Sequence, residues 1–142
     1  MRFAVGAENA VQHNKLCRER DIRFRMTYYP LNGQSTVLEQ TFKLTRPPLV
    51  LVHGLWSDPS TWTFRLANDA RFIISKVDYE ASNARSFSYN VSAVYSLVSG
   101  GIEAAISKAH NEGIAVTQVD VIGHSMGGIL TRLYAADPAY KR

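Results

Sequence analysis

The first third of the chain alternates apolar and polar positions. In residues 22–29 the apolar side chains recur at every second position, and residues 36–44 repeat the alternation. This period of two is typical of strands that bury one face. Between the two segments, Pro30, Asn32 and Gly33 supply the backbone angles that a turn requires. The pattern therefore predicts an antiparallel hairpin with one buried face.

The pattern changes after Pro47 and Pro48. Residues 49–52 (LVLV) are all apolar, as in a parallel strand that is covered on both faces. The elements predicted after it are a short helix capped by Ser60, a strand within 71–80, a helix over 91–111, a strand over 117–123 and a helix that begins at 126 and ends before Pro138. This alternation predicts an α/β fold with a mostly parallel sheet, an antiparallel N-terminal hairpin in front of it, and helices on both faces.

Gly100 and Gly101 interrupt the helix predicted over 91–111. Glycine inside a helix weakens it, and it also permits a close approach by another segment. The pair thus predicts either a kink or a place where another backbone comes near.

The composition fits one soluble domain of 142 residues, because 46% of the residues are hydrophobic and 20% are charged. We divide it into an N-terminal extension and hairpin (1–46) and a core (47–142). No apolar run approaches the roughly 18 residues that cross a bilayer, and the N-terminus is too polar for a signal peptide. Cytoplasmic residence is the default expectation, although the sequence does not determine the compartment.

The charge and the cysteine content exclude several kinds of partner. The net charge of +4 arises in residues 1–50, where basic residues alternate with acids as on a solvated strand face. We therefore expect no nucleic-acid partner. Cys17 is the single cysteine, so neither an internal disulfide nor a structural zinc site is expected. No metal or other cofactor is implied.

The segment with the clearest chemistry is VDVIGHSMGG, residues 119–128, which contains the motif GxSxG at Gly123, Ser125 and Gly127. It lies between a predicted buried strand and a predicted helix. A serine in such a tight turn presents its hydroxyl at the end of the strand, and the flanking glycines remove side chains that would clash. The N-terminus of the following helix favours negative charge there.

Two motifs resemble those of the α/β-hydrolase superfamily, in particular bacterial lipases and related esterases. PPLVLVHGLWSDPSTW resembles the strand and loop of the oxyanion hole, and VDVIGHSMGGILTRLY resembles the nucleophile elbow. The resemblance covers residues 48–137 and implies that Ser125 is the nucleophile. It also implies that the backbone amides of Leu55 and Met126 bind the oxyanion. The motif residues His53, Gly54 and His124 then support the loops by packing and hydrogen bonding, and neither histidine is the catalytic base.

The rest of a catalytic triad is not evident in the chain. In this superfamily the order is serine, acid, histidine, but after Ser125 the chain contains only Asp137 as a carboxylate and no histidine. We expect His13 and His110 to face solvent. We expect the chain to be the amino-terminal part of an enzyme that hydrolyses small or lipid carboxylic esters, with the acid and histidine beyond residue 142 and little turnover by these residues alone.

Three alternatives remain at this level. In the first, the chain is a non-catalytic relic or interaction fragment. In the other two, the parent enzyme is an acyltransferase or a thioesterase, because the same elbow serves any acyl acceptor. The strand that ends at Gly123 is expected to lack a neighbour on one side, which predicts self-association through an uncovered sheet edge. Substrate chain length and oligomeric state are not determined by these residues.

Overall fold

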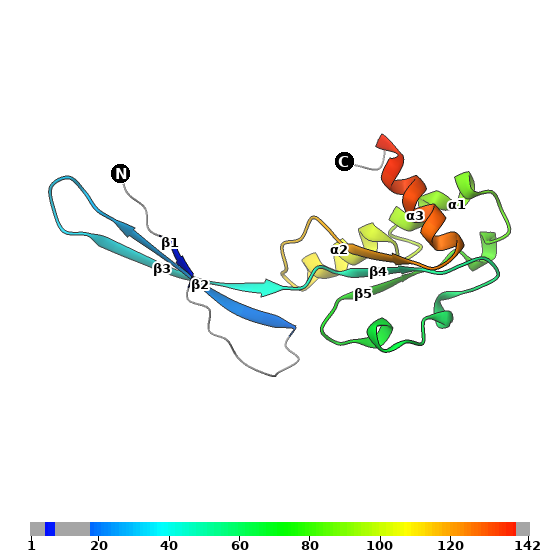
Figure 1. The fold of residues 1–142 in the computed structure, drawn as a ribbon, viewed down its shortest axis with the longest axis horizontal. Helices are drawn as coiled ribbons and strands as arrows, with labels where there is room; N and C mark the ends of the chain where they lie inside the picture. The colour runs from blue at the N-terminus through cyan, green and yellow to red at the C-terminus, as the bar shows by residue number, and fades with distance from the viewer. Residues whose placement is uncertain (1–4, 8–17, 139–142) are drawn as a thin grey trace. The chain divides into compact units, whose positions relative to one another are not determined.

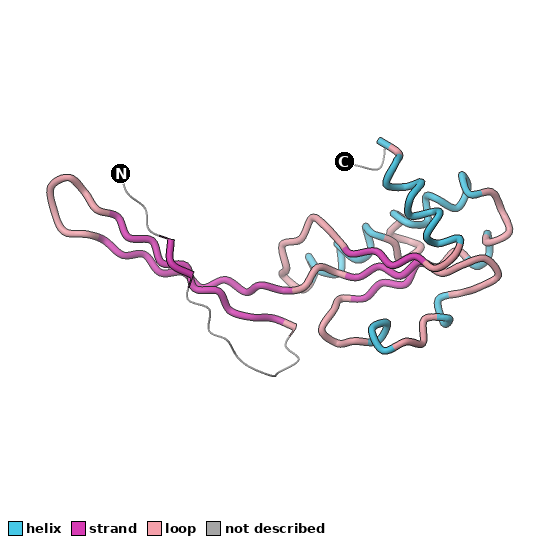
Figure 2. The backbone as a smooth tube through the Cα atoms, in the orientation of Figure 1, coloured by secondary structure: helices cyan, strands magenta, loops and turns pink. Residues whose placement is uncertain are grey.

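The computed structural model describes residues 5–7 and 18–138, and it divides the chain into two compact units, Met1–Arg46 and Pro47–Arg142. The first unit consists of strands, and the second contains a sheet with its helices (Figures 1 and 2). Each unit is described by itself. No helix in the described ranges is long and apolar enough to cross a membrane.

The first unit is a three-stranded antiparallel sheet with the order β1-β2-β3. Strand β2 (Glu19–Tyr28) pairs with β3 (Thr36–Thr45) over ten residues, with Ile22 opposite Phe42. This confirms the predicted antiparallel hairpin. The three-residue strand β1 (Val5–Ala7), which the sequence pattern did not predict, pairs with the middle of β2.

The prediction that one face of this hairpin is buried is wrong for the described part of the unit. The apolar residues do share one face, but Phe24 is 46% exposed and its cross-strand neighbour Phe42, an edge-to-face partner at 5.3 Å, is 53% exposed. Alternation specifies which side chains lie together, because side chains on a strand point to opposite faces in turn. It does not specify a segment that covers them.

The second unit is built on a parallel sheet with the order β5-β4-β6. The central strand β4 (Leu49–Val52) pairs with β5 (Ile74–Val77) on one side and with β6 (Asp120–Gly123) on the other. All four residues of β4 are at most 3% exposed. The predicted strand, covered on both faces, is therefore confirmed.

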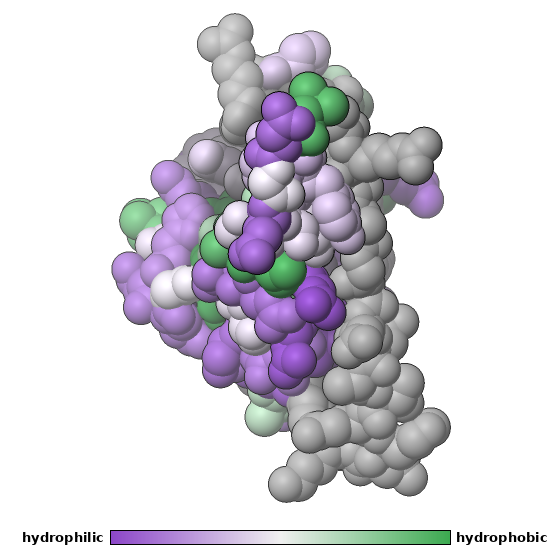
Figure 3. Space-filling view, turned by 90° about the vertical axis from the view of Figure 1, so that its left-hand side faces the viewer, coloured by the Kyte–Doolittle hydropathy of each residue, from purple (hydrophilic) through white to green (hydrophobic). Residues whose placement is uncertain are grey.

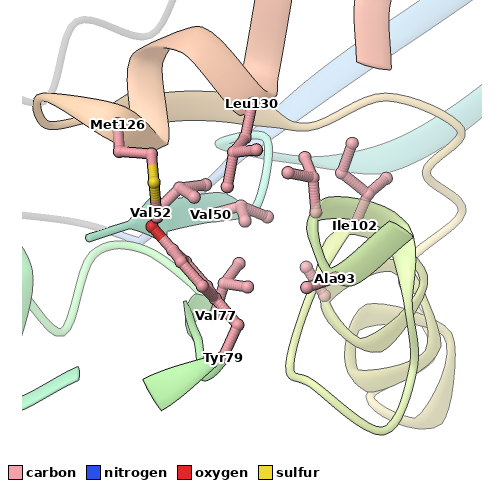
Figure 4. Packing of buried hydrophobic residues seen from close by; sticks show 10 residues of the cluster. Val50, Val52, Val77, Tyr79, Ala93, Ile102, Met126 and Leu130 are labelled. Carbon is pink, nitrogen blue, oxygen red and sulfur yellow. The ribbon is translucent and has the colours of Figure 1, made fainter. Parts of the chain in front are cut away.

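Helical segments cover both faces of this sheet, but they are of different kinds. Helices α1 (Phe87–Tyr95), α2 (Ile102–Asn111) and α3 (Met126–Ala136) pack with Val50 and Val52 on one face (Figure 4). On the opposite face, Leu49 and Leu51 pack against Trp62 and Ala67. These last two residues belong to a segment that contains the short 3-10 helices η1 (Pro59–Thr61) and η2 (Arg65–Asn68).

The cap predicted for the short helix is wrong. The side chain of Asp58, rather than Ser60, caps η1 by accepting a hydrogen bond from the Ser60 amide at 2.5 Å. Pro59 follows Asp58 and occupies the first helical position, which suits proline because the amide at that position has no partner within the helix.

The single helix predicted over 91–111 is also wrong, since α1 and α2 are separate helices. Gly100 between them has a φ of +73°, and a side chain there would lie 2.7 Å from the Lys76 carbonyl oxygen. The Ser75 hydroxyl donates to the Gly100 carbonyl at 2.7 Å, and the Asp78 amide donates to the Ser99 carbonyl at 2.7 Å. The glycines thus mark the close approach of another backbone, which was the second of the two predicted possibilities.

Candidate active site

Ser125 occupies the tight turn between β6 and α3, because β6 ends at Gly123 and α3 begins at Met126. Its backbone angles are φ 52° and ψ −120°, a combination that an L-residue adopts only under constraint. Such strain costs about 1–3 kcal/mol and persists where the surroundings enforce it. The Ser125 residue is exposed. The fold therefore presents this hydroxyl to solvent from a strained backbone.

The flanking glycines allow the turn to form. A side chain at Gly127 would overlap the carbonyl oxygen of Val52, because the start of α3 packs directly on the end of β4. A side chain at Gly123 would lie 2.6 Å from the amide nitrogen of Gly128. Both positions exclude any larger residue. The spacing of the GxSxG motif is thus explained by two backbone contacts, one on each side of Ser125.

The loop that follows β4 lies directly against this turn. A Cβ at Gly54 would be 3.1 Å from the Cβ of Ser125 and 3.1 Å from Nδ1 of His124. In the same loop, Trp56 has a φ of 55°, and it is the other non-glycine residue with positive φ in the described chain. Two strained backbone segments, remote in sequence, therefore meet at Ser125.

The two amides predicted to bind an oxyanion belong to these two segments. Leu55 follows Gly54, and Met126 follows Ser125 as the first residue of α3. In the part of the chain that the structure describes, neither amide donates a hydrogen bond to the protein. The Met126 amide also belongs to the N-terminal end of α3, where the partial positive charge of a helix is concentrated.

Comparison with known proteins agrees with this geometry. The sequence model of the alpha/beta hydrolase family matches residues 49–140, which is most of the chain and includes both segments at Ser125. The chain belongs to the α/β-hydrolase family. No curated protein and no solved structure matches it significantly. Family membership confirms the resemblance to the α/β-hydrolase superfamily and the predicted fold class, and it supports a hydrolase in general terms.

Within this hydrolase fold, His53 is a packing residue of the loop. Its side chain is fully buried, and its ring stacks on Tyr79 with the ring centres 4.1 Å apart. Nδ1 lies 3.0 Å from the Gly54 carbonyl oxygen, a distance at which the Nδ1–H tautomer donates a hydrogen bond. The Tyr79 hydroxyl donates to the backbone carbonyl of His53. Burial raises the pKa of Tyr79 to about 12, so the hydroxyl stays protonated and keeps donating.

Asn83 is a second support of the loop, and the sequence analysis missed it. It is 4% exposed and follows the short 3-10 helix η3 (Glu80–Ser82). Its Oδ1 accepts the Trp56 amide at 2.7 Å, and its Nδ2 donates to the carbonyls of Gly54 at 2.9 Å and Ser57 at 3.3 Å. One buried amide thus holds the backbone on both sides of Leu55. No local motif marks Asn83, because all three partners are more than 25 positions away.

The described histidines do not supply a base to Ser125. The Nε2 atom of His110 lies 2.8 Å from the Val116 carbonyl near the end of α2. The ring of His124 is exposed and lies edge-to-face against Trp62, with the ring centres 6.5 Å apart. His13 falls outside the described residues. In the described ranges the Ser125 side chain has no hydrogen-bond partner. No group of acidic, histidine or cysteine side chains in those ranges is arranged to hold a metal ion.

Proposed function

We propose that this chain carries the nucleophile and the oxyanion hole of a serine hydrolase that cleaves carboxylic esters through an acyl-serine intermediate. The observation that carries the proposal is the strained conformation of Ser125 with the Gly54 loop against it. Strain of this kind clusters at active sites, where it positions a reacting group. A strand-to-helix serine with a second loop at its side is the arrangement that acyl transfer requires.

The chemistry assigned to these residues has two halves. The Ser125 oxygen attacks the ester carbonyl carbon and loses its proton to a general base, while the carbonyl oxygen becomes an oxyanion that accepts hydrogen bonds from the Leu55 and Met126 amides. Collapse of this intermediate breaks the bond to the alcohol, which leaves with the proton from the base. Water then attacks the acyl-serine in the same way and releases the acid. Loss of one oxyanion donor costs about 3–4 kcal/mol in comparable enzymes.

In this proposal the base and its orienting acid come from polypeptide outside residues 1–142. The described histidines support this, because His53 is buried in the loop and His110 contacts Val116. Asp137 caps the C-terminal end of α3, away from the turn at its start. The rival, a non-catalytic relic, predicts that no acid and histidine follow Arg142. Translation of the gene beyond this residue distinguishes the two.

An apolar substrate group is favoured by the side chains next to the loop. Leu55 is 46% exposed and Trp56 is 80% exposed, so both offer apolar surface in the loop whose Gly54 packs against Ser125. Trp62 and Tyr79 are instead core residues, 8% and 4% exposed. An ester with an apolar acyl or alcohol group would cover the two exposed side chains.

The test is turnover of p-nitrophenyl esters of increasing chain length by the full-length protein, with Ser125→Ala as the matched control. We expect hydrolysis that is lost in the variant, with a burst of p-nitrophenol that reports the acyl-serine. Faster turnover of matched thioesters would indicate a thioesterase. Transfer of the acyl group to an added alcohol would indicate an acyltransferase. Equal turnover by Ser125→Ala would contradict the proposal.

A further inference from the structure

Within the described residues, the second unit buries one imidazole and two carboxamide side chains. They belong to His53, Asn83 and Asn90, each of which is at most 4% exposed. Buried polar groups require hydrogen-bond partners, so their contacts show which part of the backbone each side chain holds. The surface seen in Figure 3 instead mixes hydrophobic with hydrophilic residues, and it indicates no particular ligand. The buried carboxamides are therefore the more informative groups.

The carboxamide of Asn83 contacts three backbone groups of the loop after β4. Its oxygen accepts the Trp56 amide, and its nitrogen donates to the carbonyl oxygens of Gly54 and Ser57. The reverse orientation of the amide would oppose an oxygen to two carbonyls and an NH₂ group to an N–H. One acceptor and two donor hydrogens in a single short side chain are a property of asparagine. Neither a carboxylate nor a hydroxyl at this position can make the same three bonds.

The Gly54–Leu55 peptide is held at its oxygen. The Gly54 carbonyl oxygen accepts a hydrogen bond from Asn83 at 2.9 Å and lies 3.0 Å from Nδ1 of His53. Peptide bonds in the described chain are not cis. A trans peptide is planar, and its C=O and N–H point in opposite directions. The Leu55 N–H therefore points away from Asn83, and the groups that hold the oxygen fix its direction.

The next peptide, Leu55–Trp56, is held at its N–H by the same side chain. The Trp56 amide donates to the Asn83 oxygen at 2.7 Å, and Trp56 has a φ of 55°. A bulky residue keeps such a conformation only where its surroundings enforce it. Asn83 bonds to the backbone on both sides of Trp56, at its own amide and at the Ser57 carbonyl. The strained conformation of this loop is thus enforced by one buried carboxamide.

We infer that Asn83 is a positioning residue of the oxyanion hole, because it sets the direction in which the Leu55 amide points. The inference rests on the proposed function, in which this amide binds the oxyanion. A donor stabilises an oxyanion best when it is already oriented before the charge develops. A hydrogen bond at the Gly54 oxygen also polarises the peptide and strengthens its N–H as a donor. Asn83 acts through the Gly54–Leu55 peptide and contacts no reacting atom.

Asn83→Asp tests the inference because it keeps the size and the acceptor of the side chain but removes the donor. At pH 8 the introduced carboxylate opposes the Gly54 and Ser57 carbonyl oxygens. We expect kcat for p-nitrophenyl esters to fall at least about tenfold in the full-length protein, while KM changes less than about twofold. At lower pH the carboxyl binds a proton and regains a donor. The ratio of variant to wild-type kcat, in which titration of His53 cancels, should therefore rise at least about threefold from pH 8 to about pH 5.

Asn90→Asp is the matched control. The Asn90 carboxamide is 1% exposed and also donates to two backbone carbonyls, those of Ser82 at 3.0 Å and Arg85 at 3.4 Å. Neither carbonyl belongs to the loop that contains Leu55. The same chemical change at Asn90 should therefore lower stability and leave kcat within about threefold of the wild-type value. Urea denaturation and circular dichroism measure the stability and the folding of each variant.

Hydrogen exchange of the Trp56 amide reports on the loop without any turnover. Exchange should become faster in Asn83→Ala, which has no acceptor, and stay slow in Asn83→Asp. Asn83→Ala introduces no charge, so it also replaces the aspartate variant if that variant does not fold. Unchanged exchange in Asn83→Ala, kcat within about twofold of wild type in the Asn83 variants, or an equal loss of kcat in Asn90→Asp would overturn the inference. Failure of the proposed function would show differently, because Ser125→Ala would then hydrolyse the esters as fast as the wild type.

Discussion

Gly54 packs closely against Ser125, although 71 positions separate them along the chain: a Cβ at Gly54 would be 3.1 Å from the Cβ of Ser125. This contact fixes the loop after β4 to the turn before α3. Any nucleophilic role of Ser125 therefore depends on a loop that allows almost no added volume. The Leu55 amide, next to Gly54, is therefore held close to Ser125.

Gly54→Ala is expected to lower activity more than stability. The added methyl group would meet two side-chain atoms at 3.1 Å and the His124 carbonyl oxygen at 3.3 Å, so the loop and the turn must move apart by a few tenths of an ångström. A displaced Leu55 amide loses much of its effect on the oxyanion, so we expect kcat for ester hydrolysis to fall about 100-fold. Steady-state kinetics of the full-length protein measure the effect. Unchanged kcat would show that Leu55 is not an oxyanion donor.

Gly127→Ala and Gly128→Ala form a matched pair at the start of α3. The first would drive a methyl group into the Val52 carbonyl oxygen, whereas the second meets its nearest neighbour, the Gly123 carbonyl oxygen, at an ordinary 3.5 Å. We expect Gly127→Ala to lose several kcal/mol of unfolding free energy or to fail to fold. Gly128→Ala should gain up to about 1 kcal/mol from helix propensity. Urea denaturation measures both, and equal destabilisation of the two would contradict the packing described here.

Asn83→Ala is expected to release the loop around Leu55. The variant removes the acceptor of the Trp56 amide and the donor to the Gly54 carbonyl, so we expect kcat to fall at least about tenfold while KM changes little. Asn90→Ala is the matched control. Asn90 is equally buried, but its side chain binds Ser82 and the Arg85 carbonyl. The Asn90→Ala variant should lose stability and keep kcat within about threefold of the wild-type value. Parallel loss of kcat in both variants would remove Asn83 as a positioning residue.

Because the Tyr79 hydroxyl is buried, we expect the free energy of unfolding to depend on pH. Burial raises its pKa from 10.0 to about 12, so the folded state holds the proton more tightly than the unfolded state does. The stabilisation is fully present below about pH 10 and is lost as the pH rises from 10 to 12. Tyr79→Phe removes this titration and the hydrogen bond to His53. We therefore expect the stability difference between wild type and variant to shrink over that range in urea titrations. A constant difference would contradict the assignment.

The features that the sequence predicted are those set by local pattern. The run 49–52 and the glycines around Ser125 specify a buried strand and a tight turn without reference to distant residues. The Gly100–Gly101 pair marked this region, but the pattern did not show that α1 and α2 are separate helices, because Leu97 and Val98 continue the helical spacing yet are 52% and 96% exposed. The break arises where Gly100 meets Lys76, a contact between segments far apart in sequence. Asn83 was missed for the same reason.

The most direct test of the central claim is covalent labelling of the full-length protein with a fluorophosphonate, followed by peptide mass spectrometry. The reagent transfers its phosphonyl group to an activated serine and fluoride leaves, so the modified peptide identifies the nucleophile. We predict a single modification at Ser125 that is absent in Ser125→Ala and after heat denaturation. Labelling at another serine, or no labelling of the folded protein, would contradict the assignment of Ser125 as the nucleophile.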